Sequence, residues 1–279
     1  MLPLPTGSNR RILMHKVPHP LKGRAALVTG SSNGIGLAVA KDLAKAGCNI
    51  VLHGLEAEDA MQSQREALES EHGVSVSYIR ADLSEPKEIK RMVADILQRH
   101  GVIDVVVNNA VTRSFDPVVD LPVEAWDKSI AVNVSAAFHL IRLTLPTMLD
   151  RGWGRIFNIT SVYGSRGAAN RVGYVTSKHA LIGMTRAVAL ETLNRGVTCN
   201  AICPGSVLTP DTDNRVRALM ADESIDRDEA TRKFLAGKQP IGRFIESGHV
   251  SELLSFLCGE AGRDITGAVL PVDGGWLAS

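Results

Sequence analysis

The stretch Arg24-Ala-Ala-Leu-Val-Thr-Gly-Ser-Ser-Asn-Gly-Ile-Gly36 decides the fold. Its first half is short, apolar and without alternation, which is typical of a strand that is buried on both faces of a sheet. Its second half contains three glycines and opens a helix predicted over about residues 34–46. The amides and the dipole at a helix N-terminus attract a pyrophosphate, and glycines let the backbone approach such a ligand closely.

The rest of the chain alternates between expected strands and expected helices. The strands cover about residues 49–53, 74–79, 103–107, 155–159, 198–202 and 269–272, and the helices about 57–71, 85–99, 123–149, 173–195 and 247–258. Such alternation predicts an α/β fold of the Rossmann type, a doubly wound parallel sheet with helices on both faces. Binding is expected where the carboxyl ends of the strands open a crevice.

We expect one catalytic domain over residues 21–279, because the sequence shows neither an internal repeat nor a linker. Residues 1–20 contain four prolines and are predicted to form an irregular arm. Residues 206–240, with a highly charged segment at about 211–238, are expected to form a lid that closes over the substrate. A static surface helix is the alternative for this segment.

The composition excludes several classes of function. The formal net charge is +1, which gives no case for a nucleic-acid partner. No strictly apolar run approaches the roughly 20 residues that cross a bilayer, so no membrane partner is expected. The N-terminus lacks a signal-like apolar core, and the four cysteines form no C-x-x-C pair, so we expect a cytoplasmic protein without a metal site.

Tyr174 and Lys178 lie four residues apart in a segment whose apolar residues follow helical spacing. On a helix such positions share one face, so the phenol and the ammonium would lie side by side. A free tyrosine loses its proton near pH ~10, and a neighbouring ammonium lowers that pKa. The pair is therefore a candidate proton-transfer device for an alcohol or a carbonyl. The same spacing also occurs on ordinary helices, where the tyrosine packs and the lysine is solvated.

Other motifs in the chain favour the catalytic interpretation. Ser161 ends an apolar run thirteen residues before Tyr174. Together with the glycine-rich turn, these residues resemble the short-chain dehydrogenase/reductase family from about residue 22 to the C-terminus. The matching motifs are T-G-x-x-x-G-x-G at 29–36, N-N-A-G at 108–111 with Val111 in place of the last glycine, and the P-G turn at 204–205.

The resemblance implies a division of labour among four residues. Tyr174 would be the acid/base, Lys178 would lower its pKa and hold the nicotinamide ribose, and Ser161 would hydrogen-bond the substrate oxygen. Asn133 would support a water-linked proton relay through Lys178. Hydride transfer belongs to the cofactor, and the protein handles the proton. Without the resemblance, Ser161 would be a cap of the turn after its strand, and Asn133 a satisfied buried amide.

The resemblance also implies a dinucleotide site. Its expected residues are Gly30, Ser32, Asn33, Gly34, Ile35, Gly36, His53, Asp82, Leu83, Asn109, Ala110, Tyr174, Lys178, Pro204, Gly205, Val207 and Thr209. We expect NAD rather than NADP, because no arginine or lysine lies in His53-Gly54-Leu55-Glu56 and Asn33 occupies a turn position that is basic in some NADP enzymes. Asp82 would face the adenine, although alone it would be a capping or turn residue.

Several stretches resemble one branch of the family, the bacterial D-3-hydroxybutyrate dehydrogenases. They include Asn49-Ile-Val-Leu-His-Gly, Ala81-Asp-Leu-Ser, Lys238-Gln-Pro and Asp273-Gly-Gly-Trp276. The resemblance implies NAD-dependent interconversion of a small 3-hydroxy acid and its 3-keto acid. It also implies a homotetramer.

The residues that would hold the substrate depart from that branch. It grips the carboxylate with glutamines, a histidine and a lysine, where this chain has Arg113, Tyr163, Arg171 and Arg215, and Ser206 replaces a large aromatic residue. Since arginine binds carboxylates in a bidentate fork, we expect a larger, more cationic pocket for a longer or more anionic hydroxy acid. Solvated surface arginines are the alternative. Reduction of another carbonyl, such as a 3-oxoacyl thioester, a sugar or a polyol, and nucleotide sensing without catalysis are the competing functions.

Overall fold

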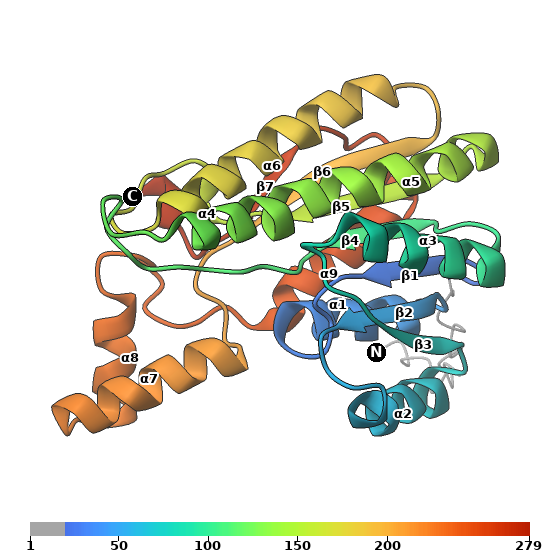
Figure 1. Cartoon of the computed structure of the whole chain (residues 1–279). Coiled ribbons are helices and arrows are strands. Elements are labelled where there is room, and N and C mark those ends of the chain that lie inside the picture. The colour runs from blue at the N-terminus through green and yellow to red at the C-terminus, as the bar shows by residue number, and fades with distance from the viewer. Residues whose placement is uncertain (1–19) are drawn as a thin grey trace, which may run out of the picture.

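The computed structural model describes residues 20–279 (Figure 1). Seven parallel strands form one sheet in the order β3-β2-β1-β4-β5-β6-β7, which confirms the predicted doubly wound α/β fold. The strands are β1 (Ala25–Val28), β2 (Asn49–Gly54), β3 (Val76–Arg80), β4 (Val105–Asn108), β5 (Gly154–Ile159), β6 (Val197–Pro204) and β7 (Val269–Val272). Each predicted strand is present, with ends shifted by a few residues.

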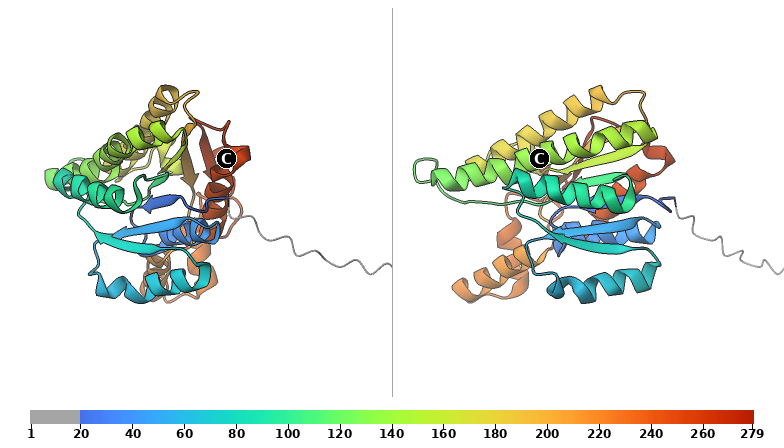
Figure 2. Two further views of the ribbon diagram at one scale, coloured as in Figure 1. Left: turned by 90° about the vertical axis from the view of Figure 1, so that its right-hand side faces the viewer. Right: turned by 45° about the vertical axis from the view of Figure 1, so that its right-hand side comes forward.

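Helices cover both faces of this sheet (Figures 1 and 2). They are α1 (Gly34–Lys45), α2 (Gln62–His72), α3 (Pro86–His100), α4 (Val123–Ile130), α5 (Ala136–Arg151), α6 (Val172–Glu191), α7 (Pro210–Glu223), α8 (Arg227–Leu235) and α9 (Ser247–Cys258). In β1, Ala26 and Val28 pack with apolar residues of α1 and α9, whereas Leu27 packs with those of α3 and α5. The strand is apolar throughout because both of its faces are buried.

The strand order places the ligand crevice. The chain runs outward from β1 to β3 and then returns to β4 on the other side of β1, so the order reverses between β1 and β4. Loops that leave the carboxyl ends of these two strands diverge, and a crevice forms between them. The turn after Val28 and the segment after Asn108 therefore face each other across this opening.

Two helix ends and the interior of one helix differ from the sequence prediction. Helix α2 begins at Gln62 rather than near residue 57, after a single 3₁₀ turn over Asp59–Met61. Helix α6 ends at Glu191 rather than near residue 195, and the chain leaves the helical conformation at Asn194 and Gly196, whose φ angles are +59° and +74°. The predicted helix over 123–149 contains a π-helical segment between α4 and α5.

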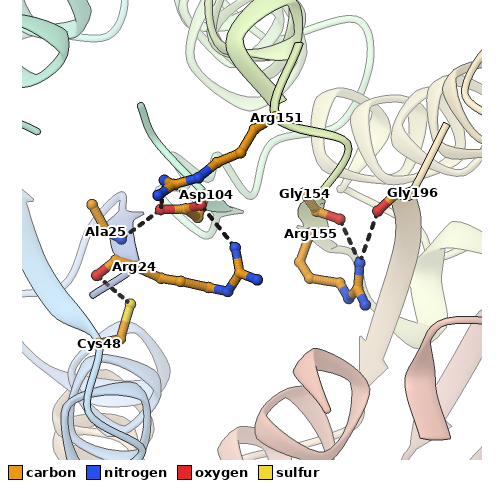
Figure 3. Close-up of polar contacts among 8 residues, drawn as sticks. All are labelled: Arg24, Ala25, Cys48, Asp104, Arg151, Gly154, Arg155 and Gly196. Carbon is orange, nitrogen blue, oxygen red and sulfur yellow. Dashed lines mark hydrogen bonds and ion pairs between the residues drawn. The ribbon is translucent and has the colours of Figure 1, made fainter. Parts of the chain in front are cut away.

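A charged network joins the amino ends of the central strands (Figure 3). The buried Asp104 carboxylate accepts from the Ala25 amide at 2.8 Å and from the guanidinium groups of Arg24 and Arg151 at 3.1 and 3.0 Å. The buried Arg155 guanidinium donates instead to main-chain oxygens, including that of Gly196. The network lies at the opposite end of the sheet from the crevice, where it stabilises the strand ends.

The continuous helix from Val123 to Arg151 meets the length and hydropathy thresholds of a membrane span, with a mean hydropathy of 1.2 over an 18-residue window. The sequence prediction did not identify this helix as a candidate span, because polar residues interrupt its apolar runs. The helix packs against α3, α6 and β5 in the second core cluster, so its composition also suits a helix that covers a sheet.

Helices α7 and α8 project from one end of the sheet (Figure 2). They pack against each other around a small core of Val216, Ala230, Leu235 and Phe244. The segment is the expected lid, and its closure over a substrate stays a prediction. Of the predicted arm at 1–20, residues 1–19 lie outside the described residues.

Candidate active site

The glycine-rich turn is locked to the end of β4. Gly30 has a φ of +59°, which a glycine adopts without strain. The Asn109 side chain donates to the main-chain oxygens of Thr29 and Gly30, and the Thr29 hydroxyl accepts from the amides of Asn109 and Ala110. A Cβ atom on Gly36 would lie 2.3 Å from the oxygen of Gly30, so only glycine fits there. The turn is thus held in place before any ligand binds.

A pocket at the ends of β2 and β3 contains many of the residues predicted to bind the dinucleotide. It is lined by Gly30, Ser32, His53, Asp82, Leu83 and Ala110, among others. Buried His53 accepts from the Gly30 amide through Nδ1 and donates to the Ala81 oxygen through Nε2, and burial lowers its pKa, so it stays neutral. Asp82 accepts from the amide and hydroxyl of Ser84, so it serves the turn as well as the pocket.

The other predicted dinucleotide residues lie along the same crevice or flank it. Ile35, Asn109, Tyr174, Lys178, Pro204, Gly205, Val207 and Thr209 line the adjoining cleft. Asn33 is exposed at the N-cap of α1, and Gly34 faces Thr209. Val111, which replaces a glycine of the family motif, is exposed and does not have a positive φ, so the larger side chain is accommodated.

Glu56 lines the pocket but was not among the residues predicted from the sequence to bind the cofactor. The Tyr78 hydroxyl donates to the Glu56 main-chain oxygen at 2.9 Å and lies 3.4 Å from its carboxylate, which lines the same pocket as Asp82. Burial raises the pKa of Glu56, but hydrogen bonds from Ser32, main-chain amides and Tyr78 lower it by more, so its pKa lies below the ordinary value. A fixed negative charge therefore lies at the end of β2. The contact with Tyr78 spans 22 residues, which no local motif reveals.

Ser161, Tyr174 and Lys178, the predicted reaction centre, come together in the cleft. Tyr174 and Lys178 share one face of α6 and are 7% and 3% exposed. The Lys178 Nζ donates to the Ile159 oxygen at 2.7 Å and lies 5.4 Å from the Tyr174 ring centroid. Ser161 caps the 3₁₀ turn after β5 by accepting from the Tyr163 amide at 3.3 Å, and it is one of the groups that lower the pKa of Tyr174.

Opposing effects set the pKa of Tyr174. Burial raises it, but the charges of Lys178 and Arg113 and hydrogen bonds to Ser161 and Arg113 outweigh burial, so the net pKa lies below the ordinary value. Burial lowers the pKa of Lys178, Tyr174 raises it and Arg113 lowers it. The phenol is thus more acidic than a free tyrosine, as proton exchange with an alcohol requires.

Asn133 lies in the π-helical segment and is buried. Its side chain accepts from the Thr112 amide at 2.8 Å and donates to the Thr112 oxygen and to the hydroxyls of Ser129 and Ser177. Among the described residues no direct hydrogen bond joins Asn133 to Lys178, so the relay predicted for it would need water. Its visible role is to hold the loop after β4 against α6.

All five predicted substrate residues line the cleft in front of Tyr174: Arg113, Tyr163, Arg171, Ser206 and Arg215. The Tyr163 ring makes an edge contact with that of Tyr174, at a centroid distance of 6.3 Å. Arg113 lies 5.4 Å from the Tyr174 centroid and pairs with Asp211 of α7 at 3.2 Å. These arginines therefore line the cleft, and their contact with a substrate stays a prediction.

Further cleft residues were not predicted as substrate contacts. Phe234, Lys238 and Trp276 also line the cleft, and Trp276 makes an edge contact with Tyr163 at a centroid distance of 5.5 Å. Buried Gln239 accepts from the Ser206 amide at 2.6 Å and donates to the Ser206 oxygen, which fixes the turn after β6. The Lys-Gln-Pro motif was the available signal for Lys238 and Gln239.

The two adjoining hollows and the glycine turn fit a dinucleotide. One hollow lies at the N-terminus of α1 and the ends of β2 and β3, and the other leads to Tyr174. The arrangement offers main-chain amides for a pyrophosphate and polar groups for ribose hydroxyls, next to a proton-transferring phenol.

Known proteins with related sequences and structures agree with this geometry. The chain matches the profile of the short chain dehydrogenase family over residues 24–219. D-beta-hydroxybutyrate dehydrogenase from Cupriavidus necator is 42% identical over 258 residues, which are 92% of this chain and 99% of the relative. The enzyme of the same name from Rhizobium meliloti is 40% identical over 255 residues, 91% of this chain and 99% of the relative.

Among solved structures, L-sorbose reductase from Gluconobacter frateurii, complexed with NADPH and L-sorbose, has a TM-score of 0.89 at 30% identity. The match covers 94% of this chain and 99% of that one. Relatives thus act on different alcohols and ketones, and a neighbour in structure binds NADPH.

Proposed function

This chain belongs to the short chain dehydrogenase family and is an oxidoreductase that acts on a CH–OH group; from this premise we propose that it interconverts a 3-hydroxy acid and its 3-keto acid with NAD. The observation that supports the proposal most is the buried Tyr174–Lys178 pair in a cleft lined by arginines. A carboxylate bound by these arginines would bring a neighbouring hydroxyl to the phenol.

The protein's own residues account for the proton. When NAD is bound, its nicotinamide supplies the acceptor for the hydride that leaves the alcohol carbon. The hydroxyl proton passes to the Tyr174 phenolate, and the carbon–oxygen bond becomes a carbonyl. Ser161 holds the substrate oxygen, and Lys178 favours the phenolate through its charge. We also propose that Asn133 orders a water between itself and Lys178 for the return of the proton.

NAD is the proposed cofactor because of the negative charge at the end of β2. A 2′-phosphate would approach the Glu56 carboxylate, which Ser32 and Tyr78 hold in place. Like charges in such a pocket are unfavourable, whereas a carboxylate can accept from ribose hydroxyls. Residues 53–56 contain neither arginine nor lysine, and Arg80 of the neighbouring strand donates its Nε to the Leu55 main-chain oxygen.

The pocket supports a substrate that is larger or more anionic than 3-hydroxybutyrate. Arg113, Arg171 and Arg215 line the cleft together with Lys238, and the small Ser206 leaves space between them. Arginine at such positions favours planar anions such as carboxylates.

Reduction of another carbonyl, such as a sugar, a polyol-derived ketone or a 3-oxoacyl thioester, is the second candidate function. It is favoured by the likeness to L-sorbose reductase in structure. It would leave the arginine-lined cleft without an anion to bind, and for that reason we place it second. Nucleotide sensing without catalysis conflicts with the assembled Ser161, Tyr174 and Lys178.

Turnover of a substrate panel tests the proposal. The purified protein is given NAD or NADP with D-3-hydroxybutyrate, longer 3-hydroxy acids and uncharged alcohols, and the absorbance of the reduced cofactor is followed. We expect 3-hydroxy acids to be oxidised with NAD, and Arg171→Ala to lower kcat/KM about tenfold or more for them. Best turnover of an uncharged alcohol, unaffected by Arg171→Ala, would reject the proposal.

A cytoplasmic homotetramer is part of the proposal. Exposed apolar side chains on α5 and α6, those of Phe138 and Leu190, support an interface between copies of the chain. Light scattering of the purified protein gives the number of chains, and a monomer at working concentration would exclude the assembly.

A further inference from the structure

Cations and aromatic rings alternate from the reaction centre outward. Next to Tyr174 lies Tyr163, and the Arg171 guanidinium lies 5.4 Å from the Tyr163 centroid and 4.6 Å from that of Phe115. Arg215 of α7 follows, and its guanidinium carbon lies 5.4 Å from the Phe115 centroid. Arg171, at the N-cap of α6, and Arg215, in the lid, thus approach the same Phe115 ring.

The row ends at a second aromatic ring. The Arg215 guanidinium carbon lies 5.0 Å from the centroid of Phe234 of α8, and the Lys238 Nζ lies 4.4 Å from it. Lys238 also donates to the Phe234 oxygen at 2.6 Å, which leaves two ammonium protons for another acceptor. We call Arg215 and Lys238 the distal cations.

The distal cations have no carboxylate partner. Arg113, beside Tyr174, pairs with Asp211, but within residues 20–279 neither Arg171, Arg215 nor Lys238 forms an ion pair. Burial lowers the pKa of Lys238, and the charges of Arg215 and Arg171 lower it further. Burial likewise lowers the pKa of Arg215 and Arg171 lowers it further, while Asp211, which pairs with Arg113, raises it without outweighing them. Like charges gathered in a partly buried cleft are unfavourable unless an anion binds between them.

We propose that Arg215 and Lys238 form a second anion subsite, so that the substrate is a hydroxy acid with a further carboxylate or phosphate at the end remote from its first carboxylate. This inference rests on the function proposed above. Arg171, which contacts Tyr163 next to the reaction centre, would hold the first carboxylate. Arg215 shares the Phe115 ring with Arg171, but it also lies over the Phe234 ring of the lid together with Lys238, so the distal cations extend the row toward a different part of a longer molecule.

The surroundings of the subsite fit a chain with charged ends. Phe115 is 48% exposed although it lies between two guanidinium groups, and a bound methylene chain would cover it. Ser206, held by Gln239, lines the cleft with a small side chain and leaves room along its floor. A bidentate arginine binds both oxygens of one carboxylate and leaves a lone pair free on each. The distal cations lie over Phe234 rather than over Tyr163, and this position favours a second anion over a further contact with the first.

Matched substrate pairs test the subsite. We compare 3-hydroxypentanoate with 3-hydroxypentanedioate, and 3-hydroxyhexanoate with 3-hydroxyhexanedioate, which differ only in a terminal methyl or carboxylate. The phosphate ester 3-hydroxy-4-phosphooxybutanoate separates a phosphate from a carboxylate. We expect kcat/KM with NAD to be about tenfold or more higher for the preferred dianion than for its monoanionic partner.

Substitution of the distal cations identifies the residues. Arg215→Gln and Lys238→Met are each expected to lower the ratio of kcat/KM between dianion and monoanion about tenfold, through KM. The matched control is Arg217→Gln, which removes the same charge from α7 where Arg217 pairs with Asp213 on the surface. Arg215→Lys, which keeps a charge, should restore part of the ratio. Equal ratios in Arg215→Gln and Arg217→Gln would overturn the proposal.

A binding measurement separates this inference from the proposed function. Pentanedioate and pentanoate, which have no hydroxyl, are added to the NAD-loaded protein, and the midpoint of thermal unfolding is recorded. We expect pentanedioate to raise the midpoint more, and Arg215→Gln to remove the difference. If monoanions and dianions are oxidised at equal kcat/KM, and pentanedioate and pentanoate shift the unfolding midpoint equally, the second subsite is overturned and the proposed function stays intact. Binding of pentanedioate without oxidation of any hydroxy acid would overturn the proposed function instead.

Discussion

The Lys178 ammonium lies 5.4 Å from the centroid of the Tyr174 ring, one helical turn away in α6, and is fixed there by a hydrogen bond of 2.7 Å to the main-chain oxygen of Ile159. Both side chains are buried, so little water screens the charge. The end of β5 thereby fixes the Lys178 ammonium of α6 beside the Tyr174 phenol of the same helix.

The pH dependence of oxidation should report the pKa of Tyr174. Oxidation needs the phenolate, so kcat/KM rises as the pH passes upward through a pKa that lies below the ordinary ~10. Burial raises this pKa, and Lys178 and Arg113 lower it. Arg113→Gln removes one lowering charge, so we expect the midpoint of the kcat/KM profile to move to higher pH. A midpoint that stays in place or falls would show that Arg113 does not act on Tyr174.

The preference for NAD should depend on the Glu56 carboxylate. Glu56→Gln keeps the size of the side chain and removes the charge that faces a 2′-phosphate. We expect the ratio of kcat/KM with NAD to that with NADP to fall about tenfold or more. Glu58→Gln, at an exposed position two residues on, is the control. A wild-type protein that prefers NADP, or an unchanged ratio in Glu56→Gln, would contradict this account of the cofactor.

The network at the amino ends of β1 and β4 should govern stability without touching the chemistry. Asp104→Asn leaves Arg24 and Arg151 without their shared carboxylate (Figure 3). Because Asp104 is fully buried while both arginines are partly exposed, we expect a loss of about 2–4 kcal/mol in the free energy of unfolding. Urea unfolding measures it. The ratio of NAD to NADP turnover should stay constant, and a loss under 1 kcal/mol would contradict the assigned role.

Local patterns in the sequence were sufficient for the sheet, whereas the candidate reaction centre also needed the resemblance to a known family. The central strands β1, β4, β5 and β6 are buried on both faces, so their apolar runs are visible without their neighbours. The spacing of Tyr174 and Lys178 gives their shared face directly, since helical geometry relates positions four apart. The turn at Gly30 and Gly36 is likewise a local feature.

Features made by contacts between distant segments could not be predicted in this way. Glu56 acquires its place from Tyr78, and Lys238 reaches the cleft because the next residue, Gln239, is bound to Ser206 in the turn after β6. The π-helical segment that contains Asn133 has no local signal in the sequence, and Asn133 is held by partners in the loop after β4 and in α6. Such positions depend on tertiary packing rather than on periodicity.

The central claim is that the Tyr174 hydroxyl exchanges the substrate proton, and Tyr174→Phe tests it most directly. The substitution removes only the hydroxyl from a buried ring, so we expect NAD affinity, measured by calorimetry, to change less than threefold. Turnover of the best 3-hydroxy acid should fall by roughly 10²-fold or more, the typical contribution of general acid–base catalysis. Turnover within tenfold of the wild type, with NAD still bound, would contradict the account.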